Sequence, residues 1–283
     1  MPDHTLTIVG AGLIGSSFGL ALRRAGFTGP IVGVSSPPAA AAALAAGAID
    51  RAAPLAEAVA DADLVFLAQP IGRILDTLRR LDPLLKPGAL VTDAGSTKCE
   101  IADLGLRTIR RGRFLGGHPM AGKEKRGAAA AEASLFQGCA WVLTPEDPAD
   151  LEAPSVKQFV HWLHQIGARP IWMDPAEHDR VVALTSHLPQ LASTALAATI
   201  AENLQPAARI DVAGPGLADM TRLAASSYEL WRDIVATNTE CIDRALAAYI
   251  QKLEHMRENL RTRQLQQEFS SGAALTARLR RMG

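Results

Sequence analysis

The segment "GGHPMAG" most clearly suggests chemistry, because it holds a histidine between two glycines and a proline. Core histidines usually lie inside a periodic apolar segment, and His118 does not. Pro119 fixes its own φ and biases His118 away from the helical region, which helps to fix where the imidazole points. The glycines would let a planar ring and a ribose approach the backbone. Neutral imidazole near pH 7 is the usual acceptor of a hydroxyl proton. We therefore predict that His118 is the general base of an alcohol oxidation rather than an incidental loop histidine.

A second polar segment, "TDAGSTKCE", follows a predicted strand at 90–92. The carboxyl ends of strands in an open parallel sheet face the crevice in which ligands bind. Ser96 and Thr97 could donate hydrogen bonds to a substrate oxygen there, and Lys98 could supply positive charge. One of these hydroxyls could instead cap a helix that begins near Lys98. A residue on this loop could do both, so the two interpretations stay open.

The segment "IVGAGLIGSS" places Gly10, Gly12 and Gly15 in the spacing G-x-G-x-x-G, between the first predicted strand and the first predicted helix. These positions allow a tight turn, close approach of the backbone to a pyrophosphate, and close packing of helix on strand. Backbone N–H groups of the first helical turn, which includes Leu13 and Ile14, would face the phosphates. The context favours dinucleotide binding over a plain glycine turn.

The end of the second strand normally reports which dinucleotide is bound, because an NAD site usually carries Asp or Glu there. Here the strand ends "GVSSPP", with Ser35 and Ser36 at that place. The serines and prolines also resemble a helix start, so two hydroxyls and a helix N-terminus could bind a 2′-phosphate. No Arg or Lys lies between Ser35 and Asp50. We predict that NADP is used at least as well as NAD.

Other polar side chains are explained without a site. His161 and His164 are three residues apart on a predicted helix, but no third ligand is evident, so no metal site is predicted. Lys123, Lys125 and Arg126 are interpreted as a solvated rim that attracts an anionic small-molecule substrate.

The first half of the chain alternates short β-rich segments with helix-length segments. Strands are predicted at 6–9, 31–34, 64–67, 90–92, 114–116, 141–144 and 169–173, and helices at 13–24, 38–46, 71–80, 98–111 and 154–166. Such alternation predicts βαβ units and an α/β fold with a doubly wound, mainly parallel Rossmann-type sheet. A dinucleotide-binding domain is predicted over residues 1–173.

Strand patterns are absent from the second half, and a helical substrate and dimerisation domain is predicted over 174–283. Long helical patterns cover 176–203 and 229–262, the segment "IDVAGPGLAD" between them is interpreted as a loop, and a frayed basic tail is expected at the end. Helices of about 30 residues cannot all bury their apolar faces in so small a domain. A homodimer is therefore predicted.

Composition excludes several classes of protein. Lys plus Arg equals Asp plus Glu at 29 each over 283 residues, so neither nucleic acid nor an anionic membrane is a predicted partner. No segment approaches 18 consecutive apolar residues, and the start lacks the pattern of a signal peptide. The scattered cysteines Cys99, Cys139 and Cys241 suit reduced thiols. A cytoplasmic enzyme is expected.

The order of the motifs resembles that of the prephenate and arogenate dehydrogenases, the cyclohexadienyl dehydrogenases of tyrosine biosynthesis. The segments that carry the resemblance are "GAGLIGSS", "TDAGSTK", "GGHPMAG", "SHLPQ" and "DMTRLAASSYELW", spread over residues 5–260. One departure is that Tyr228 stands where the family usually has proline.

The resemblance implies a role for each matching residue. His118 would be the catalytic base and Ser96 would contact the substrate hydroxyl. His187 would line the substrate site, and Arg222 would bind a substrate carboxylate. Glu124 and Asp219 would be polar neighbours that govern access.

The implied reaction is the oxidative decarboxylation of prephenate, or of arogenate, to 4-hydroxyphenylpyruvate or tyrosine. Hydride leaves the carbinol carbon for NAD(P), carbon dioxide is lost, and aromatisation drives the reaction without a metal. Two other functions remain open from the residues. One is another two-domain dehydrogenase of the β-hydroxyacid type, and the other is a non-catalytic NAD(P)-binding sensor.

Overall fold

The described part of the computed structural model comprises residues 4–123, 125–204, 210–262 and 264–281. These residues form an eight-stranded sheet with the order β3-β2-β1-β4-β5-β6-β7-β8. The strands are β1 Leu6–Val9, β2 Ile31–Val34, β3 Arg51–Ala52, β4 Leu64–Leu67, β5 Leu90–Asp93, β6 Arg113–Pro119, β7 Ala140–Thr144 and β8 Arg169–Trp172. All neighbours pair in parallel except β6 and β7. The predicted mainly parallel, doubly wound sheet is confirmed.

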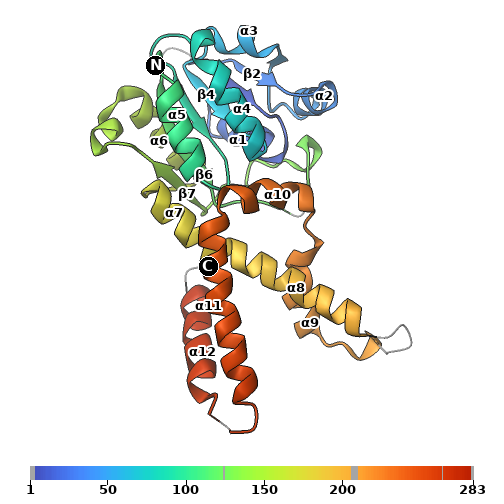
Figure 1. Ribbon diagram of the computed structural model, residues 1–283. Coiled ribbons are helices and arrows are strands. Elements are labelled where there is room, and N and C mark those ends of the chain that lie inside the picture. The colour runs from blue at the N-terminus through green and yellow to red at the C-terminus, as the bar shows by residue number, and fades with distance from the viewer. Residues whose placement is uncertain (1–3, 124, 205–209, 263, 282–283) are drawn as a thin grey trace.

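Helices cover both faces of this sheet (Figure 1). One face carries α1 Leu13–Arg24, α2 Pro37–Ala45 and α6 Pro154–Gln165, and the other carries α3 Leu55–Val59, α4 Ile71–Leu81 and α5 Cys99–Thr108. Aromatic rings fill the first interface, where the centroids of Phe18 and Phe66 lie 4.6 Å apart and both pack on Trp141. Aliphatic side chains such as Ile74 and Leu78 fill the second. Two cores of this size hold the strand ends rigidly.

The strand order changes direction between β1 and β4, because the chain runs outward from β1 through β2 to β3 and then returns to pair β4 with the other side of β1. In open α/β sheets ligands bind in the crevice beyond the carboxyl ends of the strands at this point. Gly10, immediately after β1, lies at that point.

Beyond β8 the chain is helical, as predicted. The helices are α7 Pro175–Val182, α8 Leu188–Asn203, α9 Pro215–Thr221, α10 Tyr228–Thr237, α11 Thr239–Glu258 and α12 Gln266–Arg280. A π-helical turn, Ala183–His187, joins α7 to α8, and a 3-10 turn, Arg222–Ala225, follows α9. Within the described residues no helix is long and apolar enough to cross a membrane.

Several expectations for the helical half were wrong in detail. The tail is not frayed, because its residues form α12, whose Glu268 pairs with Lys252 of α11. The segment "IDVAGPGLAD" contains the start of α9. The helix predicted over 229–262 is broken at Asn238, whose side chain bonds residues of the candidate site.

In the first half of the chain, strand β3 and helix α3 were not predicted, because elements of two and five residues show no periodicity.

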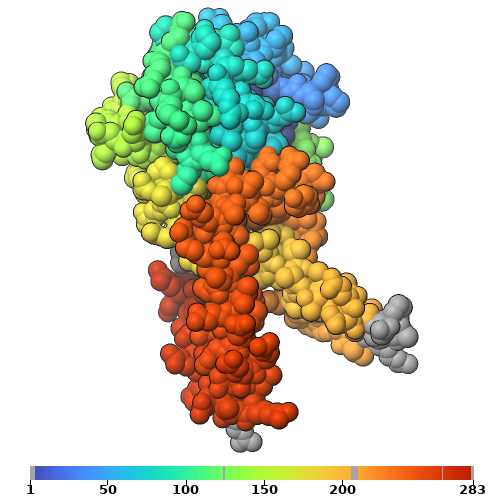
Figure 2. All heavy atoms as spheres, in the orientation of Figure 1, coloured from blue at the N-terminus to red at the C-terminus, as the bar shows by residue number. Residues whose placement is uncertain are grey.

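The helical half forms two arms that extend away from the sheet, one built from α8 and α9 and the other from α11 and α12 (Figure 1). Figure 2 shows open space between these arms. Large apolar side chains are exposed on both of them: Leu204, Met220, Ile250, Leu253, Phe269, Leu275 and Leu279. Helices in water rarely leave such faces uncovered.

Candidate active site

The glycine turn after β1 has the geometry of a pyrophosphate cradle. Gly10 has φ +102°, and a side chain there would overlap the backbone of Ala68. A side chain at Gly15 would overlap the carbonyl oxygen of Gly10, so this glycine permits close packing of α1 on β1. Gly12 has neither a positive φ nor a close neighbour: its φ is −83°, and an added Cβ would meet nothing within 4 Å. The open space beside Gly12 would let a pyrophosphate approach the backbone closely.

The first turn of α1 completes this cradle. Gly12 is the N-cap, no side chain caps the helix, and the first turn contains no acidic residue. The backbone N–H groups of Leu13, Ile14 and Gly15 thus lie where helix geometry leaves donors without intrahelical partners. Such an N-terminus attracts anionic groups, and phosphates in particular. The residues present fit a dinucleotide.

Ser35 and Ser36 are exposed at the carboxyl end of β2, as predicted. Ser36 is the N-cap of α2 and two prolines occupy its first turn, but no side chain caps this helix. The first turn of α2 also lacks an acidic residue. Both hydroxyls are therefore available to solvent or to a ligand at this end of the sheet.

His118 lies within β6, opposite Val142 of β7, because this strand extends beyond the predicted range 114–116. The two preceding glycines have a packing role that the sequence analysis did not give. A side chain at Gly116 would overlap the hydroxyl of Thr144, and one at Gly117 would lie 2.6 Å from the carbonyl oxygen of Asp93. These glycines let β6 pack tightly among its neighbours, which holds the backbone of His118 in place.

A fully buried ion pair supports this strand. Asp93, the last residue of β5, pairs with Lys98, and neither side chain is exposed. Asp93 Oδ1 accepts from the N–H of Gly117 at 3.0 Å, and Oδ2 accepts from the N–H of Gly95 at 2.7 Å. Burial lowers the pKa of Lys98 from its ordinary value, although Asp93 opposes that shift. Lys98 therefore joins two segments of the site, and its ammonium group is paired with Asp93.

A chain of hydrogen bonds leads inward from His118. Its Nδ1 lies 2.9 Å from Nε2 of His178, and Nδ1 of His178 lies 2.7 Å from Oδ1 of Asp179. The two α7 residues are almost completely buried. Asp179 also accepts from the N–H groups of Lys98 and Cys99 at 2.7 and 2.9 Å. The start of α5 is therefore capped by Asp179, and not by Ser96 or Thr97.

Because Asp179 caps α5, the hydroxyls of Ser96 and Thr97 are not explained as helix caps. Ser96 is half-buried and makes no helix-capping bond. Thr97 is buried, and its hydroxyl lies 2.7 Å from the hydroxyl of Thr237 in α10. Thr97 thus links the two halves of the chain.

Burial controls the protonation of the histidines. Desolvation, followed in importance by the charges of His178, Lys98 and His187, lowers the pKa of His118 well below its ordinary value. Desolvation likewise lowers the pKa of His187 to about 4. His118 is consequently neutral at pH 7 and able to accept a proton.

His187 ends the π-helical turn, beside the same cluster. The side-chain amide of Asn238 donates to Nδ1 of His187 at 3.3 Å and to the carbonyl oxygen of Asp179 at 2.8 Å. The ring of Trp231 lies edge to face with His187, at 5.7 Å between centroids. The break in the predicted helix at Asn238 thereby positions one of the predicted substrate residues.

The remaining predicted residues lie farther from this cluster. Arg222 and Asp219 are exposed on the segment of α9 and its following 3-10 turn. This segment approaches the "GKEKRG" loop, where Arg126 bonds the hydroxyl of Ser227. Glu124 lies outside the described residues. Tyr228 is the first residue of α10, a position that also suits proline, so the departure from the family pattern leaves the helix start intact.

The four additional polar residues of the cluster, Asp93, His178, Asp179 and Asn238, were not predicted. Asp93 is part of "TDAGSTK" and directly follows the strand predicted at 90–92, so its place at a strand end was a usable signal. His178 and Asp179 lie about 60 residues from His118 in sequence, within an ordinary helical pattern. No spacing rule relates them to His118.

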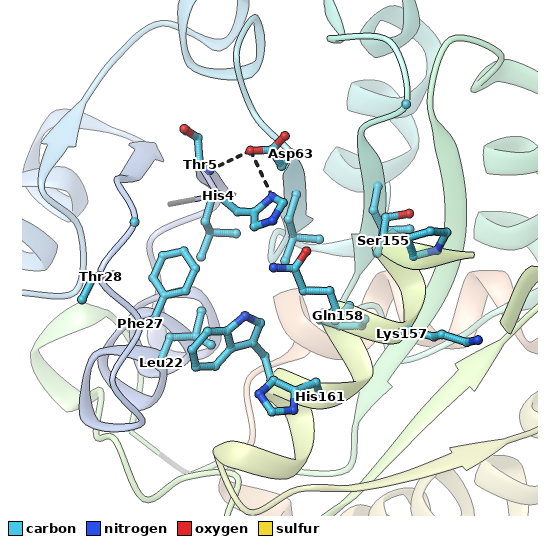
Figure 3. A pocket seen from close by; sticks show the side chains of 18 of the residues that line it. His4, Thr5, Leu22, Phe27, Thr28, Asp63, Ser155, Lys157, Gln158 and His161 are labelled. Atoms are coloured by element: carbon cyan, nitrogen blue, oxygen red, sulfur yellow. Dashed lines mark hydrogen bonds and ion pairs between the residues drawn. The ribbon is translucent and has the colours of Figure 1, made fainter. Parts of the chain in front are cut away.

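A separate cavity lies at the other edge of the sheet. A cavity of about 980 Å³ opens at the amino ends of the strands, between β1 and α6, and is drawn in Figure 3. Asp63 accepts there from the N–H of Thr5 and pairs with His4. Phe27 and Trp162 form an edge-to-face pair on another wall. This is the opposite edge of the sheet from the glycine turn and His118, so the cavity is separate from the candidate active site.

Comparison with known proteins decides the family. The family model described as "Prephenate dehydrogenase, nucleotide-binding domain" matches residues 18–172. The model described as "Prephenate dehydrogenase, dimerization domain" matches residues 174–272. The chain belongs to the prephenate dehydrogenase family. The predicted family, fold class and oxidoreductase class are thereby confirmed.

Individual members of the prephenate dehydrogenase family are similar over most of the chain. A prephenate dehydrogenase of Bacillus subtilis (strain 168) is 36% identical over 262 residues, which are 89% of this chain and 69% of that protein. The crystal structure of prephenate dehydrogenase from A. aeolicus, in complex with hydroxyphenyl propionate and NAD+, has a TM-score of 0.88 and 29% identity, covering 100% and 99% of the two chains. Synechocystis arogenate dehydrogenase has a TM-score of 0.78 and 31% identity, covering 98% of each.

Proposed function

We propose that the chain catalyses the NAD(P)-linked oxidative decarboxylation of prephenate or arogenate, with His118 as the general base. The observation that carries this proposal is the environment of His118. Its imidazole is held on a rigid strand at the carboxyl edge of the sheet, next to the "GSTK" loop, and burial keeps it neutral. A base in this state can accept the proton of the substrate hydroxyl at physiological pH.

The cofactor would be held by Gly10, Gly12, Leu13, Ile14 and Gly15. The open space beside Gly12 and the uncapped start of α1 support this assignment. NAD(P), when bound, supplies the acceptor for the hydride. The task of the protein is to orient the carbinol carbon, to remove the hydroxyl proton and to hold an anionic ring.

The substrate would be held by residues from both halves of the chain. The hydroxyl of Ser96 makes no cap, so it is suited to contact the substrate hydroxyl, and Thr97 fixes the same loop to α10. His187 would contribute a neutral imidazole beside Trp231. Arg222 would bind a carboxylate, because guanidinium grips carboxylates in a bidentate fork. Asp219 and Glu124 would be its polar neighbours.

The test is the His118→Asn variant, assayed for NAD(P)H formation with prephenate and with arogenate. Turnover should fall by roughly 10² to 10⁴, the usual contribution of a general base, while cofactor affinity is kept. In the unmodified enzyme kcat/KM should stay level as the pH falls through 6.5, because the pKa of His118 lies lower, and should decline only in more acidic solution. Near-normal turnover in the variant would remove His118 from this role. The same assay measures the preference between the two substrates.

The cofactor preference and the oligomeric state are both proposed from residues exposed on the surface. NADP should be used at least as well as NAD, because no carboxylate at Ser35 or Ser36 repels a 2′-phosphate. The chain should form a homodimer through the arms described above, because the apolar side chains exposed on α9, α11 and α12 are expected to be covered by a second subunit. Sedimentation should then give about twice the chain mass of 30.0 kDa. A monomer at micromolar concentration would contradict the dimer.

A further inference from the structure

The hydrogen bonds that lead inward from His118 have an unambiguous direction at their inner end. Both Oδ atoms of an ionised Asp179 can only accept. Burial opposes its ionisation, but hydrogen bonds from His178 and from the N–H groups of Cys99 and Lys98 outweigh burial and lower the pKa of Asp179. Nδ1 of His178, 2.7 Å from this carboxylate, must therefore carry a proton.

The direction of the next bond follows from the first. A neutral His178 with its proton on Nδ1 has a lone pair on Nε2. Nε2 of His178 then accepts from Nδ1 of His118, at 2.9 Å. A neutral His118 with its proton on Nδ1 is left with its lone pair on Nε2, the ring nitrogen away from α7.

We propose that His178 and Asp179 are positioning residues that fix the tautomer of His118, so that Nε2 of His118 is the atom that accepts the substrate proton. This inference rests on the proposed role of His118 as the base. It adds the identity of the reacting nitrogen, and a reason for two buried polar residues that the reaction itself does not require.

The hydrogen-bonded series of His118, His178 and Asp179, called the relay below, also accounts for where the substrate proton goes. The O–H bond of the substrate breaks and an N–H bond forms at Nε2 of His118, which makes that ring an imidazolium. Its Nδ1 proton can then move to Nε2 of His178, whose positive charge lies beside the Asp179 carboxylate. No further acid, base or co-reactant is needed, and the adjacent Asp179 carboxylate stabilises the charge on the His178 ring.

The surroundings hold the relay in one arrangement. Two N–H groups at the start of α5 fix the carboxylate of Asp179, and Asn238 donates to its carbonyl oxygen. His178 is fully buried, so solvent cannot replace its bonds. The other charged or titratable groups around His118 are Lys98 at the start of α5, its partner Asp93 on β5, and His187 on the π-helical turn.

The direct test is nitrogen NMR of the full chain labelled with 15N-histidine, because the chemical shift of a ring nitrogen distinguishes a protonated from an unprotonated atom. At neutral pH the signals of His118 should show a protonated Nδ1 and a bare Nε2. Assignment uses the His118→Asn variant, which lacks these signals. A protonated Nε2 in the unmodified protein would overturn the proposal, whatever its activity.

Two substitutions test the consequence for turnover. His178→Leu removes the acceptor for His118 Nδ1, whereas His178→Gln can present an amide oxygen in its place. The Leu variant should lose at least about tenfold in kcat, less than the loss of the base itself, and its His118 should show a mixture of tautomers. The Gln variant should recover most of that loss and the single tautomer. KM for the cofactor should stay unchanged in both.

A histidine outside the site provides the control. His161 is exposed on α6, and His161→Leu should leave kcat and the His118 signals unchanged. Unchanged kcat in His178→Leu would overturn the relay while leaving His118 as the base. A fully active His118→Asn would instead overturn the proposed function. If His178→Leu does not fold, the tautomer measured in the unmodified protein still decides the question.

Discussion

The two regions that meet at the candidate site are built differently. The sheet side is taken to include α7, which packs against α5, and here His118, His178, Asp179 and the Asp93–Lys98 pair all have buried partners within one chain. On the helical side, Asp219 is exposed on α9, which is part of one of the arms, and Arg222 is exposed on the 3-10 turn that follows α9. The groups that would move the proton are thus fixed before any substrate arrives. The groups that would hold the substrate anion lie where a second copy of the chain is expected to pack.

This difference implies two kinds of sensitivity. Substitutions on the sheet side should affect folding or turnover, because they disturb buried and interdependent bonds. Substitutions on the helical side should affect substrate affinity and leave the fold intact.

The largest effect is expected for Asp93→Asn. Removing the charge leaves Lys98 buried without its partner, and breaking a buried ion pair in this way costs about 3–5 kcal/mol of unfolding free energy. The backbone at Gly117, next to His118, loses a charged acceptor at the same time. Denaturant unfolding measures the loss. The control is Asp103→Asn, whose partner Arg107 is exposed on α5 and whose loss should cost about 0.5 kcal/mol or less. Equal costs for the two variants would contradict the supporting role of Asp93.

For Arg222→Ala we expect a rise in substrate KM of roughly ten- to a hundredfold, since a hydrogen bond to a charged group contributes about 1.5–3 kcal/mol. The fold, the cofactor KM and the oligomeric state should be preserved. Arg110→Ala, at an exposed arginine after α5, is the control and should leave KM unchanged. Loss of cofactor affinity with an unchanged substrate KM would assign Arg222 to the cofactor instead.

The glycine turn allows a matched pair within a single motif. Gly12→Ala adds a Cβ that meets nothing in the protein, so stability should change by less than about 1 kcal/mol. The same Cβ would intrude on a bound pyrophosphate and weaken cofactor binding by about 1–3 kcal/mol. Gly15→Ala should instead destabilise the fold by about 1–3 kcal/mol, because its Cβ overlaps the carbonyl oxygen of Gly10. Thermal unfolding and cofactor titration of both variants separate the two roles. Unchanged cofactor affinity in Gly12→Ala would place the pyrophosphate elsewhere.

The same contrast explains what the sequence could predict. Seven strands, the glycine turn and the candidate base His118 were recognisable, because alternation, glycine spacing and the absence of an apolar period are local properties. The relay was not, because the bond between His118 and His178 joins residues 60 positions apart. Asp179 caps a helix 80 residues earlier in the chain, so the start of α5 shows no cap of its own. The break at Asn238 was hidden for a similar reason. Its side chain bonds His187 and Asp179, and only the folded chain brings these together.

The smallest effect is expected at the exposed end of β2. Ser35→Asp introduces a carboxylate where a 2′-phosphate would lie, and two unit charges about 4 Å apart in water repel by only about 1 kcal/mol. The ratio of kcat/KM for NADP to that for NAD should therefore fall by roughly five- to tenfold, partly because the carboxylate can also accept from the ribose hydroxyls of NAD. Added salt should reduce the change, since the site is solvent-exposed. Ser270→Asp, on the distant α12, adds the same charge and should leave the ratio unchanged. A strong NAD preference in the unmodified enzyme would show that the missing acid does not set the preference. In that case the "GKEKRG" loop, whose following 3-10 turn packs against α1 and α2, becomes the next segment to substitute.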